Sequence, residues 1–181
     1  MTPLQKVAIG LVIVFLSARF AGYDALADPV GWGFVVAGLL PLRQRIPLGG
    51  SALTLAVVAG LVSVPLVLPT VADRLRPSGQ WGASLPQTVF CIVLCTSLGT
   101  SLARLADRAG DREARRFDLL RWVFVVVAVG PVLVYGGGVD ALTTPVAVLA
   151  VLANVVLVYL LFAVSRRGYG DDAGRARADG A

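Results

Sequence analysis

The sequence predicts an all-α protein, a bundle of six transmembrane helices with both termini in the cytoplasm. Of its 181 residues, 57% are hydrophobic and 15% are charged, whereas soluble domains average about 45–50% apolar and about 25% charged residues. The mean hydropathy of +0.81 excludes a disordered chain and an ordinary soluble domain. A backbone inside hydrocarbon has to satisfy its own hydrogen bonds, so the apolar runs are expected to be helices of one transmembrane domain, residues 1–164.

Six apolar runs are candidates for the crossings. A helix needs roughly 17–25 residues to cross a bilayer, and the first, third and sixth runs meet this length. The second run is short, about 20 Å at 1.5 Å per residue, with Pro41 near its end. The fifth is also short unless it begins between Arg116 and Arg121. The runs are Val7–Tyr23, Val30–Leu42, Ser51–Leu68, Gln87–Leu102, Trp122–Tyr135 and Val146–Val164.

The basic residues predict the orientation, because they are more frequent in cytoplasmic than in external loops. With six crossings and the N-terminus inside, thirteen basic residues lie on cytoplasmic segments, and Arg74 and Arg76 lie outside. If the short second run did not cross, the Arg104–Arg121 cluster would lie outside, against this rule. The thirteen are Lys6, Arg43, Arg45, Arg104, Arg108, Arg112, Arg115, Arg116, Arg121, Arg166, Arg167, Arg175 and Arg177.

Aromatic residues agree with this orientation, since Trp and Tyr are enriched at membrane interfaces. They are predicted to be interfacial anchors, at the outer boundary for Tyr23, Trp32, Trp81 and Tyr135 and at the inner boundary for Phe117, Trp122 and Phe162.

The first run also has features of a cleavable signal peptide. Lys6, the apolar stretch Val7–Ala18 and the sequence Ala25-Leu26-Ala27 are typical of its three regions. Arg19 interrupts the approach to the cleavage site, which favours an uncleaved span. Cleavage would leave five crossings and an external N-terminus. Without cleavage, we expect a multi-pass protein of a bacterial cytoplasmic membrane.

Two of the external turns share a sequence. Residues 22–30 match residues 138–146 at Gly, Asp, Ala, Leu, Pro and Val. The pattern predicts helix caps, with Asp28 and Thr144 as N-cap residues and Pro29 and Pro145 at the first helical position. Convergence on a good turn and a true duplication both explain the match. A duplication would be a parallel repeat, because both copies join an odd-numbered span to the next even-numbered one.

The first copy of this turn carries a resemblance. Asp24-Ala25-Leu26-Ala27-Asp28-Pro29-Val30-Gly31-Trp32, followed by Val35, Val36, Gly38 and Leu39, is similar to a segment of small actinobacterial-like membrane proteins. Those proteins have an Asp-rich turn, then Gly-aromatic and an apolar run ending in Gly-Leu. The resemblance covers about 20 residues and implies a multi-span membrane protein without implying an activity.

Few polar side chains fall inside the predicted spans, and an ionisable group there is a functional candidate. Arg19 lies about one turn below the end of the first span, where its side chain can extend to the interface and pair with Asp24 or Asp28. Binding of an anionic solute is the alternative. Asn154 lies in the middle of the sixth span, where it either joins helices or binds a solute.

Pairs of small residues four positions apart predict close helix packing. In the fourth span the same hydroxyl groups are also suited to line a polar path. The pairs are Gly33 with Ala37, Ala56 with Gly60, Thr96 with Thr100, and Ser97 with Ser101.

No catalytic, cofactor or metal site is predicted. The chain contains no His, the commonest general base and metal ligand, and no residue pair suggests an activated nucleophile. Cys91 and Cys95 lie in an apolar run, where we expect them to be small buried hydrophobes rather than metal ligands. The protein is therefore not expected to be an enzyme.

The long cytoplasmic segment after the fourth span is predicted to be an interfacial helix with ion pairs Asp111–Arg115 and Asp118–Arg121. Its arginines are expected to contact anionic lipid headgroups, each contributing about 1 kcal/mol, and no nucleic-acid partner is expected. The headgroup contacts are assigned to Arg108, Arg112, Arg115 and Arg116. Residues 165–181 are expected to form a disordered cytoplasmic tail.

These features predict a structural or accessory membrane component, in a homo-oligomer or a larger membrane complex. The alternative is a small-solute transporter or channel subunit that uses Arg19, Asn154 and the Thr96–Ser101 face.

Overall fold

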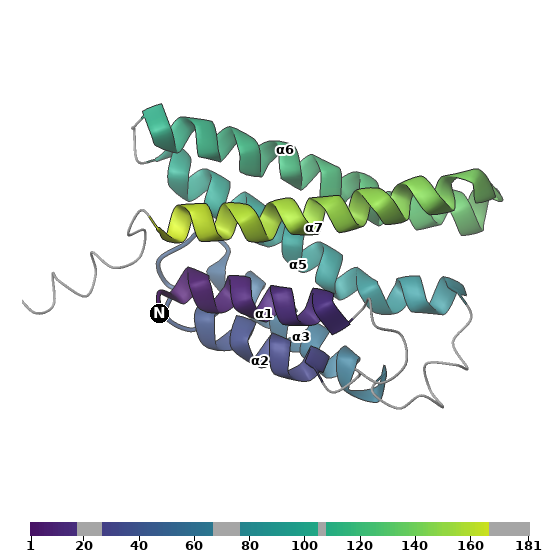
Figure 1. The fold of residues 1–181 in the computed structure, drawn as a ribbon, viewed down its shortest axis with the longest axis horizontal. Helices are drawn as coiled ribbons and strands as arrows, with labels where there is room; N and C mark the ends of the chain where they lie inside the picture. The colour runs from purple at the N-terminus through teal and green to yellow at the C-terminus, as the bar shows by residue number, and fades with distance from the viewer. Residues whose placement is uncertain (18–26, 67–76, 105–107, 167–181) are drawn as a thin grey trace, which may run out of the picture.

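The computed structural model describes residues 1–17, 27–66, 77–104 and 108–166 (Figure 1). Within these ranges the regular secondary structure is helical throughout, which confirms the predicted all-α class. A π-helix at Val132–Gly136 and a 3₁₀ turn at Asp140–Leu142 connect the last two α-helices. The α-helices are α1 (Pro3–Ser17), α2 (Ala27–Leu39), α3 (Gly49–Leu66), α5 (Pro77–Ala103), α6 (Arg108–Pro131) and α7 (Thr143–Ser165).

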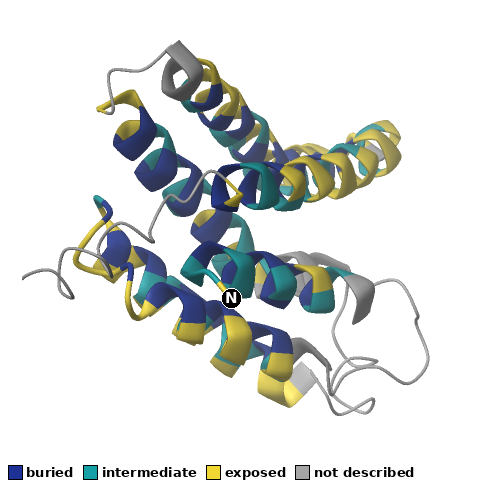
Figure 2. Cartoon of the chain, turned by 60° about the vertical axis from the view of Figure 1, so that its left-hand side comes forward, coloured by how far each residue is buried: buried dark blue, intermediate teal, exposed yellow. Residues whose placement is uncertain are grey.

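The helices form a closed ring in chain order. Each packs against the preceding and the following one, and α7 packs against α1. Helix α5 also reaches the helices across the ring. The rings of Phe90 on α5 and Trp32 on α2 meet edge to face, with centroids 5.4 Å apart, and Cys91 on α5 contacts Asn154 on α7. Buried residues line the sides of the helices that face one another (Figure 2), and the middle of α5 fills the centre of the bundle.

Successive helices run in opposite directions. The N-terminus, the α2–α3 loop, the beginning of α6 and the end of α7 therefore lie at the same end of the bundle (Figure 1). The α6–α7 turn lies at the other end, where Gly138 has φ +66°, a conformation that L side chains rarely adopt.

In the part of the chain that the structure describes, three helices are long and apolar enough to cross a membrane. Their apolar stretches are Ser84–Ala103, Arg112–Gly136 and Thr143–Ser165. Helices α1, α2 and α3 are apolar but shorter; the 13 residues of α2 extend about 20 Å at 1.5 Å per residue, against a hydrocarbon core of about 30 Å.

Two helices begin before the predicted spans. Helix α5 begins at Pro77, so Pro86 lies inside the helix, although its membrane-length apolar stretch, Ser84–Ala103, is close to the predicted Gln87–Leu102. Helix α6 runs without a break from Arg108 to Pro131, so residues 108–121 begin a membrane-length helix and are not a separate interfacial one. The reason is a single buried stripe that continues through both parts of α6 at helical spacing, formed by Phe117, Leu120, Phe124 and Val127.

Helices α1 and α2 approach so closely that glycine is required at their contact. A Cβ added to Gly10 would lie 2.5 Å from the carbonyl oxygen of Gly31, and one added to Gly38 would lie 2.7 Å from that of Pro3. The predicted pair Gly33 and Ala37 is instead exposed. The prediction was wrong because small residues also occur on the outer face of this uniformly apolar helix.

The predicted pair on α3 lies at a helix contact. Ala56 is buried, and a Cβ added to Gly60 would lie 3.1 Å from Cβ of Trp32.

The predicted caps are also wrong. Helix α7 begins at Thr143, with Leu142 at the N-cap and no side-chain hydrogen bond there. Helix α2 begins at Ala27, so Asp28 and Thr144 both lie inside a first turn. The two helices nevertheless start at equivalent positions of the repeated sequence, because the first amides of a helix need no intrahelical acceptor and a proline fits among them.

Two predicted interfacial anchors are buried. Trp32 is 3% exposed and Phe117 is fully buried, because each occupies a contact between helices rather than a helix end. Trp122 and Tyr135 are exposed, at 57% and 42%, as expected of anchors.

Candidate functional site

The polar residues of α5 form two stripes with different surroundings. Ser97 and Ser101 are buried, Thr96 is half-buried and Thr100 is exposed. Three hydroxyls donate to their own helix: Thr96 to the carbonyl of Ile92, Thr100 to that of Thr96, and Ser101 to that of Ser97, at 2.7–2.8 Å. Such bonds to a preceding turn satisfy a hydroxyl inside an apolar bundle. Among the described residues, Ser97 Oγ is buried and makes no hydrogen bond.

A pocket of about 300 Å³ between α5 and α6, the polar pocket, combines several polar side chains with a mainly apolar lining. Helix α5 contributes Thr96 and Thr100, and α6 contributes Arg115 and the ion pair Asp118–Arg121. The carboxylate of Asp118 lies 2.7 Å from the guanidinium of Arg121, as predicted from their spacing, and the Arg121 guanidinium lies 5.2 Å from the centroid of the Trp122 ring. The pocket therefore offers cations and hydroxyl oxygens to a small polar ligand.

Among the described residues that line this pocket, Asp118 supplies the carboxylate. The chain has no His, and the Asp118 carboxylate already binds a guanidinium. In the part of the chain that the structure describes, no three Cys, Asp or Glu side chains group together as metal ligands would.

Asn154 joins two helices. Its amide Nδ2 donates to the carbonyl of Ala150 on its own helix at 2.8 Å, and its Oδ1 accepts from the Cys91 thiol of α5 at 3.8 Å. The structure thus brings Asn154 to a helix contact. Cys91 and Cys95 are both buried, as predicted. The role of Cys91 as the partner of Asn154 was missed, since no local pattern links residues on two distant helices.

The four arginines assigned to lipid contacts lie in the first turns of α6. Arg112, Arg115 and Arg116 are exposed, but they divide between two surfaces. Arg115 lines the polar pocket toward α5, whereas Arg116 lines a groove toward α7. The side chain of Arg108 lies outside the described residues.

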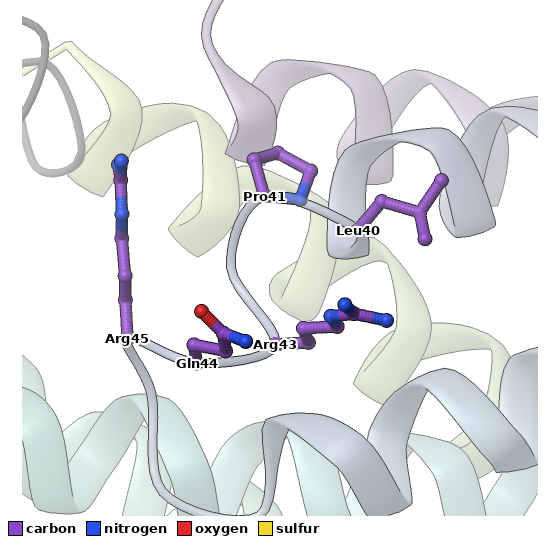
Figure 3. A pocket seen from close by; sticks show the side chains of 5 residues that line it. All are labelled: Leu40, Pro41, Arg43, Gln44 and Arg45. Carbon is purple, nitrogen blue, oxygen red and sulfur yellow. The ribbon is translucent and has the colours of Figure 1, made fainter.

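A second polar cavity, of about 430 Å³, lies within the α2–α3 loop. Arg43 and Arg45 line it together with Leu40, Pro41 and Gln44. Their side chains extend in different directions from the loop (Figure 3), so the two guanidiniums do not converge on one ligand.

The proposed pairing of Arg19 stays a prediction. Arg19 and Asp24 lie outside the described residues, as does the side chain of Asp28. Most of the predicted tail, residues 167–181, also lies outside them, while Ser165 ends α7.

Comparisons of this chain with protein-family models, with curated proteins and with solved structures find no match.

Proposed function

We propose that this protein is a non-catalytic integral membrane protein that acts as a structural or accessory component of a membrane complex. The observation that carries the proposal is that polar side chains within the bundle are hydrogen-bonded to the helices themselves. The hydroxyls of Thr96, Thr100 and Ser101 bond to their own helix, and Asn154 bonds to α5. A hydroxyl whose proton is bonded to its own helix cannot donate that proton to a solute, and the Asn154 bond holds two helices together.

The alternative is a small-solute transporter or channel subunit. The polar pocket between α5 and α6 favours it, because Thr96, Thr100 and Arg115 meet there. Arg19 would belong to the same path. Asn154 would then bind the solute in addition to its contact with Cys91.

The two functions differ in what the purified protein does alone. Reconstituted in liposomes, the chain is expected to leave their permeability to K⁺, Cl⁻ and small neutral solutes equal to that of protein-free vesicles. Cross-linked in its own membrane, it is expected to be recovered with other membrane proteins or as a homo-oligomer. Stopped-flow light scattering and ion-flux measurements test the first expectation, and mass spectrometry tests the second.

A matched pair of variants identifies the path if solute does cross. Thr100→Trp would fill the polar pocket, whereas Val126→Trp adds the same side chain to an exposed position of α6. A flux above that of empty vesicles, abolished by Thr100→Trp and kept by Val126→Trp, would refute the accessory role and establish the alternative.

We further propose six crossings with both termini in the cytoplasm of a bacterial cell. The basic residues Arg43, Arg112 and Arg166 support this orientation, since their segments share one end of the bundle and cytoplasmic ends are basic.

Cysteine labelling in intact cells tests the orientation. A membrane-impermeant maleimide is expected to label Val139→Cys in the α6–α7 turn, and to label Gly110→Cys and Arg166→Cys only after permeabilisation. The native Cys91 and Cys95 are buried, so their background reaction should be small. Labelling of Gly110→Cys from outside intact cells would exclude the proposed topology.

A further inference from the structure

An apolar groove runs along the outer face of α6 and α7. It encloses about 560 Å³ and is lined mainly by Leu and Val side chains, among them Leu119 and Leu152, which are both exposed. Among the residues that the structure describes, Arg116 is the only charged one that lines it. Exposed residues cover much of these two helices (Figure 2).

The packing of the two helices determines which residues share an end of the groove. Gly130 packs against Val146, because a Cβ added to this glycine would lie 2.7 Å from Val146 Cγ1. The two helices are antiparallel. Arg116 lies fourteen residues before Gly130 on α6, and Leu160 lies fourteen residues after Val146 on α7, so Arg116 and Leu160 are opposite each other. Arg116 and Tyr159 therefore lie at one end, which is the end that begins α6.

The groove matches the depth of one leaflet. It extends along α7 from Leu149 to Leu160, about 16 Å at 1.5 Å per residue. Half of a hydrocarbon core of about 30 Å is about 15 Å. With Arg116 at the headgroup level, the apolar end of the groove falls near the bilayer centre.

We propose that this groove binds one anionic phospholipid of the cytoplasmic leaflet. An acyl chain lies along Leu119 and Leu152, and the phosphate binds Arg116. Arg112, also exposed, precedes Arg116 by four residues and so lies on the same side of α6, one turn nearer its start, where its guanidinium also reaches the headgroup. Guanidinium groups suit phosphate oxygens because their donors match the spacing of those oxygens.

Charge argues against a second copy of the chain in this groove. A two-fold dimer in a membrane brings equal heights together, so Arg116 would lie close to Arg116 of a second copy at the headgroup level. Two like charges repel there, whereas an anionic headgroup neutralises the arginine. The inference rests on the proposed membrane insertion and is independent of the accessory role.

Native mass spectrometry of the protein in mild detergent tests the inference. We expect phosphatidylglycerol to be retained more strongly than phosphatidylcholine with identical acyl chains. Arg116→Gln should lower phosphatidylglycerol binding about fivefold, which corresponds to about 1 kcal/mol per arginine near a charged surface. Arg43→Gln is the matched control, since Arg43 is exposed at the same end of the bundle but outside the groove.

A second pair of variants tests the groove itself. Val156→Trp fills it and should also reduce phosphatidylglycerol binding, whereas Val126→Trp, exposed on α6 outside the groove, should not. Circular dichroism checks that each variant folds. If Val156→Trp does not fold, the comparison of Arg116→Gln with Arg43→Gln decides the outcome.

Four results would overturn the inference. The first two are equal retention of phosphatidylglycerol and phosphatidylcholine, and equal losses of phosphatidylglycerol binding in Arg116→Gln and Arg43→Gln. The other two are full phosphatidylglycerol binding by a folded Val156→Trp, and a dimer of the wild-type protein that Val156→Trp converts to monomers. Failure of the accessory role would appear as liposome flux and would leave lipid binding intact. Failure of membrane insertion would leave the wild-type protein unbound to either lipid.

Discussion

Gly31→Ala is expected to destabilise the bundle by about 3 kcal/mol, the upper end of the usual range for an overpacked core. The added Cβ would lie 2.8 Å from the carbonyl oxygen of Gly10, 3.0 Å from the amide nitrogen of Val14 and 2.7 Å from Val14 Cγ2. The first two are backbone atoms of α1, which no rotamer change can move away. The two helices must therefore separate, and the contacts along their whole interface are lost or weakened.

Thermal unfolding in detergent measures this effect. For a chain of this size, 1 kcal/mol corresponds to about 2–4 °C, so the melting temperature should fall by about 6–12 °C.

Gly33→Ala is the matched control, two residues away on the same helix. Nothing lies within 4 Å of the Cβ it would add, and Ala is the better helix former by about 1 kcal/mol. Its melting temperature should therefore rise by a few degrees. If Gly33→Ala and Gly31→Ala lower the melting temperature equally, the close contact between α1 and α2 does not exist.

The sequence predicts the helices well and their faces poorly. Apolar runs determine where helices form, because a bilayer excludes other backbone structure. A helix such as α2 is apolar on all sides, however, so periodicity does not distinguish its packed face from its outer face. Gly33 with Ala37 and Gly31 with Gly38 are both pairs of small residues. Only the position of α1 against α2 decides which pair lies at the helix contact. Gly31 and Gly38 are seven residues apart, a spacing that could have indicated one face.

The candidate site was predictable only in part. The stripes of Thr96 with Thr100 and Ser97 with Ser101 follow from helical spacing alone. The polar pocket also needs Arg115 and Asp118 from α6, and finding it required recognising that α6 begins soon after α5 ends. A connection this short forces the two helices to pack side by side. The sequence predicts the start of the fifth span at Trp122 and a separate helix before it, and therefore does not predict this packing.

Trp32 is the second residue whose replacement is expected to have a large effect. Its side chain is 3% exposed, meets the ring of Phe90 edge to face at 5.4 Å and covers Gly60 on α3. It therefore links α2 to both α3 and α5 near the centre of the ring. An interfacial anchor, as the sequence predicts for this position, would make none of these contacts.

Trp32→Ala is expected to destabilise the protein by about 2–3 kcal/mol. In soluble proteins a buried Trp→Ala change costs about 3–5 kcal/mol, part of which is lost transfer from water. Inside a bilayer that part is small, because lipid tails are as apolar as the core, and the remainder is lost dispersion contact and the cavity. By the scale used for Gly31→Ala, the melting temperature should fall by about 4–12 °C.

Trp122→Ala separates a packing role from an anchoring role. Trp122 is 57% exposed and is predicted to be an interfacial anchor, so its removal should change the melting temperature in detergent much less. Trp32→Phe should recover part of the loss, because a smaller ring can still meet Phe90 and fill some of the cavity. Should Trp32→Ala and Trp122→Ala prove equally mild, with no recovery by Trp32→Phe, Trp32 would be an anchor at the membrane surface and the central contact with α5 would be wrong.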